Sequence, residues 1–233
     1  AGELLATKGS ANRNIWTVFD TSTNTDAKYN STWNNWGPDY SDEIETLFLE
    51  TGNEVKDYHN SSSTCKGIDG VEDGTADDLI GLINFVRGQD YFDYNGGCDL
   101  TEDRASILAD IYHSQLIEVG APGANTDFSN NNQEAYWRSI NGYETFRLNN
   151  INRKKILYAG SNAGMLHAFD ANSGEELWAF IPPMIGSKLP LLMNTGYDGA
   201  FDNDAGGSNA IFGVDGSPVA HDVYIYGLKQ DLS

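Results

Sequence analysis

The chain has 233 residues and a formal net charge of −20, because 34 acidic residues face only 14 basic ones. A surplus of this size argues against a nucleic-acid partner, which needs a basic surface, and against docking on an anionic membrane. No apolar run approaches the roughly 18 to 20 residues that cross a bilayer, so no membrane span is expected, and the length suits one large domain or two small ones.

The first third of the chain is polar and poorly periodic, with one candidate strand and one short helix. Two arrangements are open for this region: its helical part lies against a sheet formed further along the chain, or residues 15–19, which alternate over only five positions, add a strand to that sheet. Residues 41–49 begin with a serine suited to capping a helix, and Asp42 and Glu43 place acidic groups at the positive end of its dipole. Residues 51–74 are predicted to form a loop.

The clearest helix in the sequence follows Thr75, a favourable N-cap, and ends at Gly88. Four residues spaced three or four apart form its apolar face, namely Leu79, Leu82, Ile83 and Val86. A third helix is predicted to start at Thr101, with acidic residues in its first turn. Its buried residues would be Ile107, Leu108 and Ile111.

From about residue 153 the apolar period falls to two, which predicts strands. Three short apolar runs, at residues 156–159, 165–169 and 177–181, are separated by turns at residues 161–164 and 170–174. Each turn closes with glycine, which adopts a positive φ without a Cβ penalty. Runs of this length between Gly/Asn/Asp/Ser clusters are typical of an antiparallel sheet.

Residues 168–178 resemble the repeat A-F-D-A-x-[ST]-G-x-x-L-W found in the blades of quinoprotein-like propellers. The predicted fold class is therefore α+β. A helical and loop-rich pre-propeller region at 1–152 leads into an antiparallel β-propeller-like blade at 153–233, and the two parts pack as one unit. Closed propellers need about four to eight blades, so the propeller is incomplete in this chain.

Several further segments, in the same order along the chain, resemble one family. Its patterns are I-N-[YF]-[IV]-R-G, G-D-I-x-[HN]-S, G-A-N-D-G-M-L-H-x-F-D and V-D-G-[ST]-P followed by D-V-Y. The matching segments are residues 82–90, 110–114, 160–170, 214–218 and 222–225, with a looser match of residues 13–17 to R-x-I-[YFW]-T. The family is the PilY/PilC group of type IV pilus biogenesis factors and tip adhesins.

This resemblance implies a non-enzymatic component of type IV pilus assembly, exported through the periplasm to the cell surface, at the pilus tip or outer membrane. Its partners would be minor pilins or tip proteins, together with the remaining blades or a partner strand. Its roles would be to support pilus extension, adhesion or motility. The von Willebrand-like domain of many members is missing here, so assembly is favoured over adhesion. Two alternatives stay open: a fragment of an exported quinoprotein-like dehydrogenase, and a filament-bound extracellular subunit.

The ends of the chain favour a piece of a longer protein. It begins with Ala1 rather than methionine, shows no signal peptide, and stops at Ser233 shortly after one blade. A strand at residues 223–226 would then be left at an exposed sheet edge or covered by another chain. No quinone cofactor is expected, because the cofactor funnel of such propellers is assembled from most of the blades.

Cys65 and Cys98 are the only cysteines. In an oxidising compartment they predict one disulfide, which closes a loop of about 30 residues and contributes roughly 3 to 4 kcal/mol. A two-cysteine metal site is the alternative, but no histidine lies at ligand spacing from either cysteine.

Calcium is the most plausible ligand, because oxygen donors alternate along glycine-containing loops. The candidate donors are Asp198, Asp202 and Asp204 in one loop, and Asp93, Asn95 and Asp99 in another. A third acidic stretch covers residues 69–77. No loop has the glutamate that completes an EF-hand, and flexible acidic loops explain the same pattern.

The four histidines, at positions 59, 113, 167 and 221, are dispersed and form no recognisable catalytic motif. We expect His167, which lies mid-strand, to be a structural histidine satisfied by a turn. Trp178 is assigned to the core. The neighbouring carboxylates Glu175 and Glu176 are expected to be solvated.

Five aromatic residues offer an alternative between core packing and an exposed docking patch, namely Trp33, Trp36, Tyr40, Tyr136 and Trp137. If exposed, they would suit binding through aromatic anchors or by strand addition.

Overall fold

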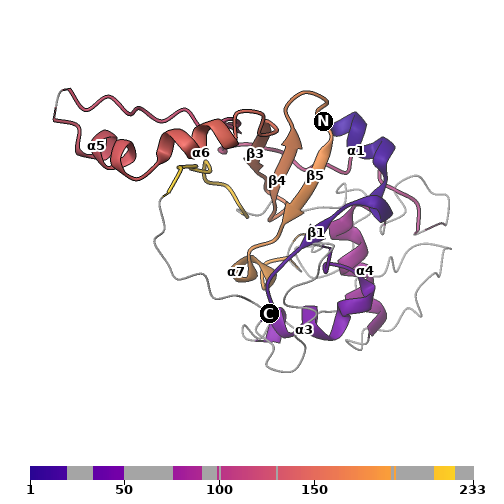
Figure 1. Cartoon of the computed structure of the whole chain (residues 1–233). Coiled ribbons are helices and arrows are strands. Elements are labelled where there is room, and N and C mark those ends of the chain that lie inside the picture. Colours follow the sequence, from indigo (N-terminus) through magenta and orange to yellow (C-terminus); the bar gives the residue numbers. More distant parts are fainter. Residues whose placement is uncertain are drawn as a thin grey trace, which may run out of the picture.

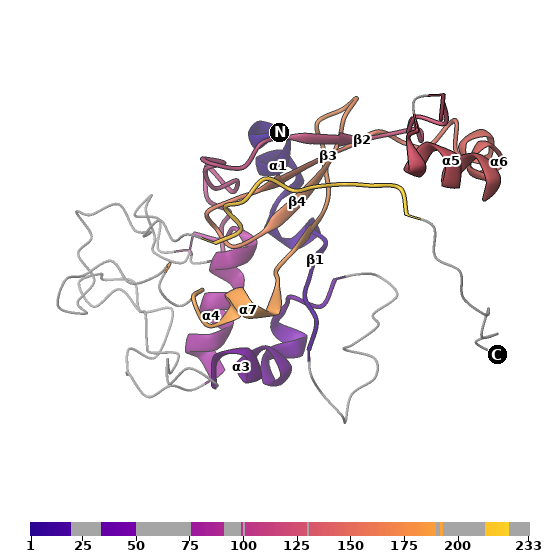
Figure 2. The same cartoon turned by 90° about the vertical axis from the view of Figure 1, so that its left-hand side faces the viewer.

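The computed structural model describes residues 1–19, 34–49, 76–90, 99, 101–129, 131–189, 192 and 213–223. A five-stranded sheet of order β1-β5-β4-β3-β2 occupies the centre. Helices α3, α4 and α7 gather at one end of it, and helices α5 and α6 project from the body on another side (Figures 1 and 2).

Four of the five strands form an antiparallel meander. They are β2 (Ile117–Val119), β3 (Ile156–Gly160), β4 (Leu166–Asp170) and β5 (Glu176–Phe180). The three predicted strands are therefore confirmed within about one residue, and both turns contain glycine at positive φ, 80° at Gly164 and 79° at Gly174. This antiparallel order is what a blade requires, while membership of a propeller stays a prediction.

The fifth strand confirms one of the two open arrangements, the addition of a strand from the N-terminal region. Strand β1 (Ile15–Trp16) pairs in parallel with β5, with Ile15 opposite Ala179. The outer edge of this segment is already occupied by the side-chain amide of Asn35. Its Oδ1 accepts from the N–H of Thr17 at 2.8 Å, and its Nδ2 donates to the carbonyl of Thr17 at 3.0 Å. At this point the sheet offers no free edge for another chain.

One irregularity in the sheet changes which side chains are buried. The register between β4 and β5 shifts between Ala168 and Phe169, so that Phe169 lies opposite Glu176. Strict alternation would pair Phe169 with Leu177 instead. The shift turns the Glu176 side chain to the same face as His167, where it is buried.

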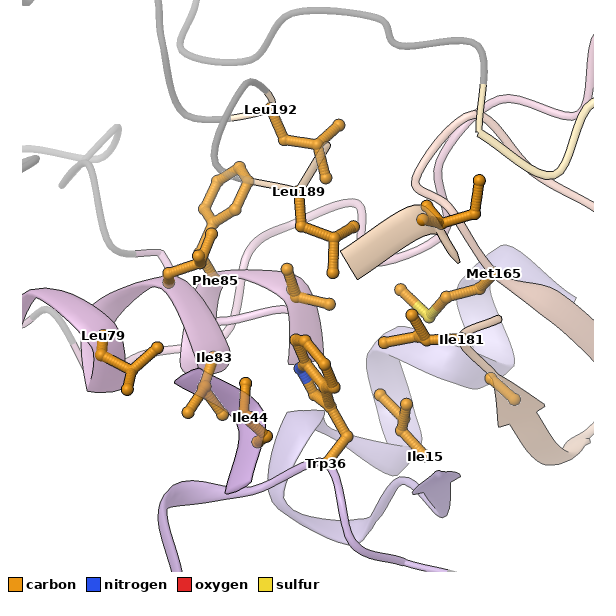
Figure 3. Packing of buried hydrophobic residues seen from close by; sticks show 14 of the residues in the cluster. Ile15, Trp36, Ile44, Leu79, Ile83, Phe85, Met165, Ile181, Leu189 and Leu192 are labelled. Atoms are coloured by element: carbon orange, nitrogen blue, oxygen red, sulfur yellow. The ribbon is translucent and has the colours of Figure 1, made fainter. Parts of the chain in front are cut away.

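The main hydrophobic core lies where the helices meet the buried face of the sheet. Helix α3 (Ser41–Leu49), helix α4 (Ala76–Arg87) and the short α7 (Pro183–Gly186) contribute to it together with strand residues. Figure 3 shows Trp36 packed among Ile15, Ile44 and their neighbours. The predicted apolar face of α4 is confirmed, since all four of its residues are buried. Helix α3 ends at Leu49 as predicted, but Ser41, the predicted cap, has helical φ and ψ and lies inside the helix.

The predicted helix starting at Thr101 is wrong: residues 101–116 form turns and irregular chain. Their backbone groups bond to distant segments instead, as when the N–H of Arg104 donates to the carbonyl of Gly88 at 2.9 Å and the carbonyl of Asp110 accepts from Asn162 at 3.1 Å. Ile107 is buried, as expected for an apolar position, but Leu108 and Ile111 are only half-buried.

Four described helices were not predicted from the sequence, namely α1 (Gly2–Lys8), α5 (Gln133–Ile140), α6 (Tyr143–Asn149) and α7. Each has eight residues or fewer, about two turns at most, so the helical spacing of apolar residues has little room to repeat. The start of α5 did carry a local signal: Asn132 caps it by accepting from the N–H of Ala135 at 3.1 Å.

We predict that Gly164→Ala destabilises the fold by about 1 to 3 kcal/mol. The φ of Gly164 is +80°, and an added Cβ would lie 2.8 Å from Ile185 and 3.0 Å from Leu189. Chemical denaturation of the variant measures the loss. Gly2→Ala is the matched control, because a Cβ there meets nothing within 4 Å; equal stability of the two variants would contradict the tight packing of this turn.

Candidate functional site

A buried ion pair joins the N-terminal segment to the sheet. Both nitrogens of the Arg13 fork donate to Glu176, Nε to Oε2 and Nη2 to Oε1, each at 2.8 Å, and both side chains are fully buried. Such a bidentate pair combines two charge-assisted hydrogen bonds with fixed geometry. The remaining nitrogen of Arg13 donates to the carbonyl of Arg87 at 2.7 Å, which connects the pair to the end of helix α4.

Arg87 continues this network toward the N-terminal segment. Its guanidinium donates to the backbone carbonyls of Trp36, Ser10 and Arg13, at 2.5, 3.0 and 2.8 Å. Burial, together with the nearby Arg13 charge, lowers the pKa of Arg87 to about 10, so the side chain remains a cation at neutral pH. Two carbonyls from residues 10–13 and one from Trp36 therefore bond to a single side chain of helix α4, which holds the three parts of the chain together.

His167 lies between the ion pair and a turn. Its Nδ1 is 2.8 Å from Oε1 of Glu176, and its Nε2 is 3.0 Å from Oγ of Ser161. Burial lowers the pKa of His167 although Glu176 opposes the effect. The ring is therefore neutral at pH 7, which lets Nδ1–H donate to the carboxylate and Nε2 accept from the serine hydroxyl. The predicted structural histidine satisfied by a turn is confirmed, because Ser161 begins the turn before β4.

The Ser161, His167 and Glu176 contacts have the order of a serine, histidine and acid triad. A reaction would require a substrate at the serine oxygen, yet Ser161 is only 1% exposed and the Glu176 carboxylate is held by Arg13. The arrangement therefore supports the fold and presents no nucleophile to solvent. The expectation that Glu176 is solvated is wrong, since the register shift buries it, whereas Glu175 is exposed as expected.

We predict that Glu176→Gln destabilises the protein by about 3 to 5 kcal/mol, because it leaves the buried Arg13 charge uncompensated. The double variant Arg13→Met with Glu176→Leu should lose clearly less than the sum of its single variants. Denaturant titration of all variants measures this coupling. Additive losses would show that the two side chains act independently.

Stability should also fall on acidification. Burial alone would raise the pKa of Glu176, but bonds from His167 and Arg13 outweigh it and hold that pKa at about 2, well below the ordinary 4.5. Both Glu176 and His167 bind protons more readily in the unfolded chain than in the folded protein. The free energy of unfolding is therefore highest above about pH 6.5 and declines below it, as His167 becomes protonated in the unfolded chain. Between pH 4.5 and 2 the protonation of Glu176 lowers it by a further amount on the order of 3 kcal/mol.

Thermal melts from pH 8 to 2.5 test this pH dependence. The variant Glu175→Gln, changed at the exposed neighbour, should keep the wild-type profile. A melting temperature that stays constant as the pH is lowered from 4.5 to 2.5 would contradict the depressed pKa of Glu176.

A second junction joins three of the segments that carry the family resemblance, 110–114, 160–170 and 214–218. His113 Nδ1 lies 2.7 Å from Oδ2 of Asp215, and the N–H of Gln115 donates to Ser217 at 3.0 Å. The hydroxyl of Ser114 accepts from the N–H of Gly160 at 2.9 Å. Residues 110–115 are thus hydrogen-bonded to the end of strand β3, and residues 213–217 are bonded to residues 113–115.

Of the third acidic stretch, the described residues include only 76 and 77, which lie in helix α4. Of the calcium donors named singly and the cysteines, they include only Asp99. It is exposed, and its Oδ1 accepts from the N–H and hydroxyl of Thr101 at 3.0 and 2.5 Å. These bonds lower the pKa of the Asp99 carboxyl. The described part of the chain has no cluster of three or more His, Cys, Asp or Glu side chains that could hold a metal. The other candidates, Asp93, Asn95, Asp198, Asp202, Asp204, Cys65 and Cys98, lie outside it.

The five aromatic residues proposed for docking fall into different environments. Trp36 is fully buried in the core and Tyr40 is half-buried, whereas Tyr136 and Trp137 are exposed on α5, Trp137 to 60%. Trp33 lies outside the described residues. The docking interpretation therefore survives only at α5, within those residues.

Trp178 lies on the sheet face opposite His167 and is half-buried, not part of the core. Its ring contacts those of Trp16 and Tyr158, with centroids 6.2 and 5.7 Å apart. This aromatic stripe covers the outer face of the sheet.

Helices α5 and α6 form a hairpin inserted between β2 and β3, with Gly142 at a φ of 74° between them. Large apolar side chains stand exposed on the hairpin and beside it, namely Phe128, Tyr136, Trp137, Ile140, Phe146, Leu148 and Ile151. The charges between them are paired locally, as Arg138 with Glu134 and Arg147 with Glu144. Apolar area with aromatics, arginine and few uncompensated charges is characteristic of the centre of protein interfaces.

The hairpin also forms a pocket with the segment 213–223. Its volume is about 530 Å³, and its lining comprises Trp137, Arg138, Asn141, Tyr143, Phe146, Asp222 and Val223. The segment passes beside α6 (Figure 1). Its residues Asp222 and Val223 line one side of the pocket. The exposed hairpin surface and this pocket together are the candidate interaction surface.

The sequence is similar to curated type IV pilus proteins. It is 31% identical over 228 residues to the type IV pilus biogenesis factor PilY1 of Pseudomonas aeruginosa strain UCBPP-PA14, covering 97% of this chain and 16% of that protein. It is 37% identical over 107 residues to a PilY1 homolog of Xylella fastidiosa strain Temecula1, covering 46% of this chain and 8% of that protein.

PilY1 of Pseudomonas aeruginosa strain PAK is 36% identical over 157 residues, which cover 67% of this chain and 12% of that protein. The chain thus spans less than a fifth of each of these relatives. No family model matches the chain, and no solved structure matches it significantly. Within the described residues, none of the helices combines the length and apolar character needed to cross a membrane.

Proposed function

Because this chain belongs to the PilY1-type family of type IV pilus biogenesis factors, we propose that it is a non-enzymatic docking module of pilus assembly. In this role it binds minor pilins at or near the pilus tip, outside the cell, and supports pilus extension and the motility or adhesion that depend on it. The candidate interaction surface on α5 and α6 is the part that contacts the pilins.

The observation that carries the proposal is the extent of the similarity, which covers 97% of the chain in one relative. The exposed apolar residues of the hairpin support the choice of docking site. Exposed residues of α5 and α6, such as Trp137, Ile140 and Leu148, stand clear of the core, so they are free to contact another protein. Tryptophan, tyrosine and arginine, which contribute most strongly to binding at protein interfaces, are all present on α5.

The hairpin is anchored at its base, where Nε of Arg153 donates to the carbonyl of Gly120, and beside the pocket, where the hydroxyl of Tyr143 donates to Asp222. Arg13, Arg87 and Glu176 tie the N-terminal segment and α4 to the sheet from which the hairpin emerges. A rigid support reduces the ordering cost of binding, since fewer groups become immobilised when the partner arrives.

The proposal predicts that Ile140→Ser combined with Leu148→Ser, made in the full-length protein, weakens binding to purified minor pilins at least about tenfold. Each change removes an exposed apolar contact without touching the core. Surface-plasmon-resonance titration with individually purified minor pilins measures binding, and counting surface pili on cells that carry the variant measures assembly.

Met184→Ser is the matched control, because Met184 is an equally apolar and even more exposed residue on α7, away from the hairpin. Its pilin binding and pilus number should equal those of the wild type. If the double variant also binds pilins and assembles pili normally, the hairpin is not the docking surface.

A further inference from the structure

The pocket beside α6 combines aromatic walls with a carboxylate. Trp137, Tyr143 and Phe146 supply the rings, and Asp222 supplies the charge. We propose that this pocket receives a lysine side chain of the pilin partner, with the ammonium group at Asp222 and the alkyl stem along the rings. The inference rests on the proposed function, and it names the chemistry by which the partner is recognised.

The aromatic walls suit both parts of a lysine side chain. The rings of Tyr143 and Phe146 have centroids 5.8 Å apart and are tilted by 46°, and Trp137 contributes to the same pocket while remaining largely exposed. Aromatic faces attract a cation within about 6 Å of the ring centroid. The four-carbon stem of lysine covers apolar surface while its charged end reaches a polar group.

Asp222 is oriented by its neighbours and keeps one oxygen available. Its Oδ2 accepts from the hydroxyl of Tyr143 at 2.7 Å, and that hydroxyl accepts from the N–H of Ala124 at 2.8 Å. Within the described residues, the ion-pair partner of Oδ1 is Nη2 of Arg153 at 3.6 Å, beyond hydrogen-bond length. The Nε of Arg153 is already used by the carbonyl of Gly120.

A single available oxygen favours lysine over arginine. The guanidinium fork binds a carboxylate best through two parallel bonds, which requires both oxygens, whereas an ammonium is a compact point charge that needs only one. An uncharged apolar side chain from the partner would instead remove water from Oδ1 of Asp222 without offering that oxygen a hydrogen-bond donor, which is costly.

Arg138 also lines the pocket, but its charge is already engaged. Its Nη2 pairs with Glu134 at 2.8 Å and its Nη1 donates to the carbonyl of Asn125 at 3.0 Å. It therefore does little to repel an entering cation. The chain as a whole, at −20, attracts basic partners over longer distances and speeds their association.

The test uses the full-length protein and individually purified minor pilins, each in three forms: unmodified, with lysines acetylated, and with lysines reductively dimethylated. Acetylation removes the charge and dimethylation keeps it. We expect acetylation of the pilin, or Asp222→Asn in this chain, to weaken binding at least about tenfold. Dimethylation should leave it nearly unchanged, and Asp222→Asn should cause no further loss with acetylated pilin.

Two controls separate charge recognition from damage to the pocket. Tyr143→Phe removes the hydroxyl that orients Asp222 but keeps the carboxylate, so it should bind the pilin more strongly than Asp222→Asn does. Circular dichroism and melting temperature establish that each variant is folded. n-Butylammonium, which reproduces the end of a lysine side chain, should compete with the pilin at millimolar concentration.

The outcomes distinguish this inference from the proposed function. If the Ile140 and Leu148 variant loses pilin binding while Asp222→Asn and acetylation have no effect, docking stands and the lysine pocket is overturned. If no minor pilin binds the wild type, the proposed function and this partner both fail. Tight binding of n-butylammonium or spermidine that never competes with the pilin would make the pocket a site for free amines and overturn the protein ligand.

Discussion

The arrangement of the molecule depends on one buried ion pair, between Arg13 and Glu176. Both charges are removed from water, and each is costly unless the other is in place. Strand β1 must therefore lie beside β5, and the β4–β5 register must turn Glu176 inward. Arg87 extends the same constraint to helix α4 by donating to the backbone carbonyls of Ser10 and Arg13. A shift of any one of these segments would leave a charge unpaired in the core.

This constraint explains why the segments resembling the pilus family meet in space although they are far apart in the sequence. Arg13 and His167 come from two of them and bond to one carboxylate, that of Glu176, and Arg87 comes from a third and bonds to Arg13. Residues from two others, His113 and Asp215, form the second junction near the end of β3. The resemblance therefore follows residues that hold the fold together, while the candidate interaction surface lies mainly on α5 and α6, outside those segments, with Asp222 and Val223 on one side of its pocket.

The candidate surface was only partly predictable. Aromatic composition indicates that some tryptophans and tyrosines contact a partner, but it cannot separate Trp36, which fills the core, from Trp137, which faces solvent. The pocket was not predicted at all. It forms only because residues 213–223, which follow α6 by about 75 residues in the sequence, pass beside that helix. A contact between such distant segments leaves no periodic signal in either of them.

The sequence by itself determined the local structure: strands β3, β4 and β5, the glycine turns between them, and helices α3 and α4, because alternation, helical spacing, caps and glycine act over a few residues. Tertiary structure alone decided the burial of Glu176, the irregular path of residues 101–116 and the position of the α5–α6 hairpin. The first depends on a one-residue register shift, and the second on backbone bonds to Gly88 and Asn162. The residues that bond to these groups, Arg13 for Glu176 and Gly88 and Asn162 for residues 101–116, are distant in sequence. Their contacts outweigh the secondary structure that the local sequence favours.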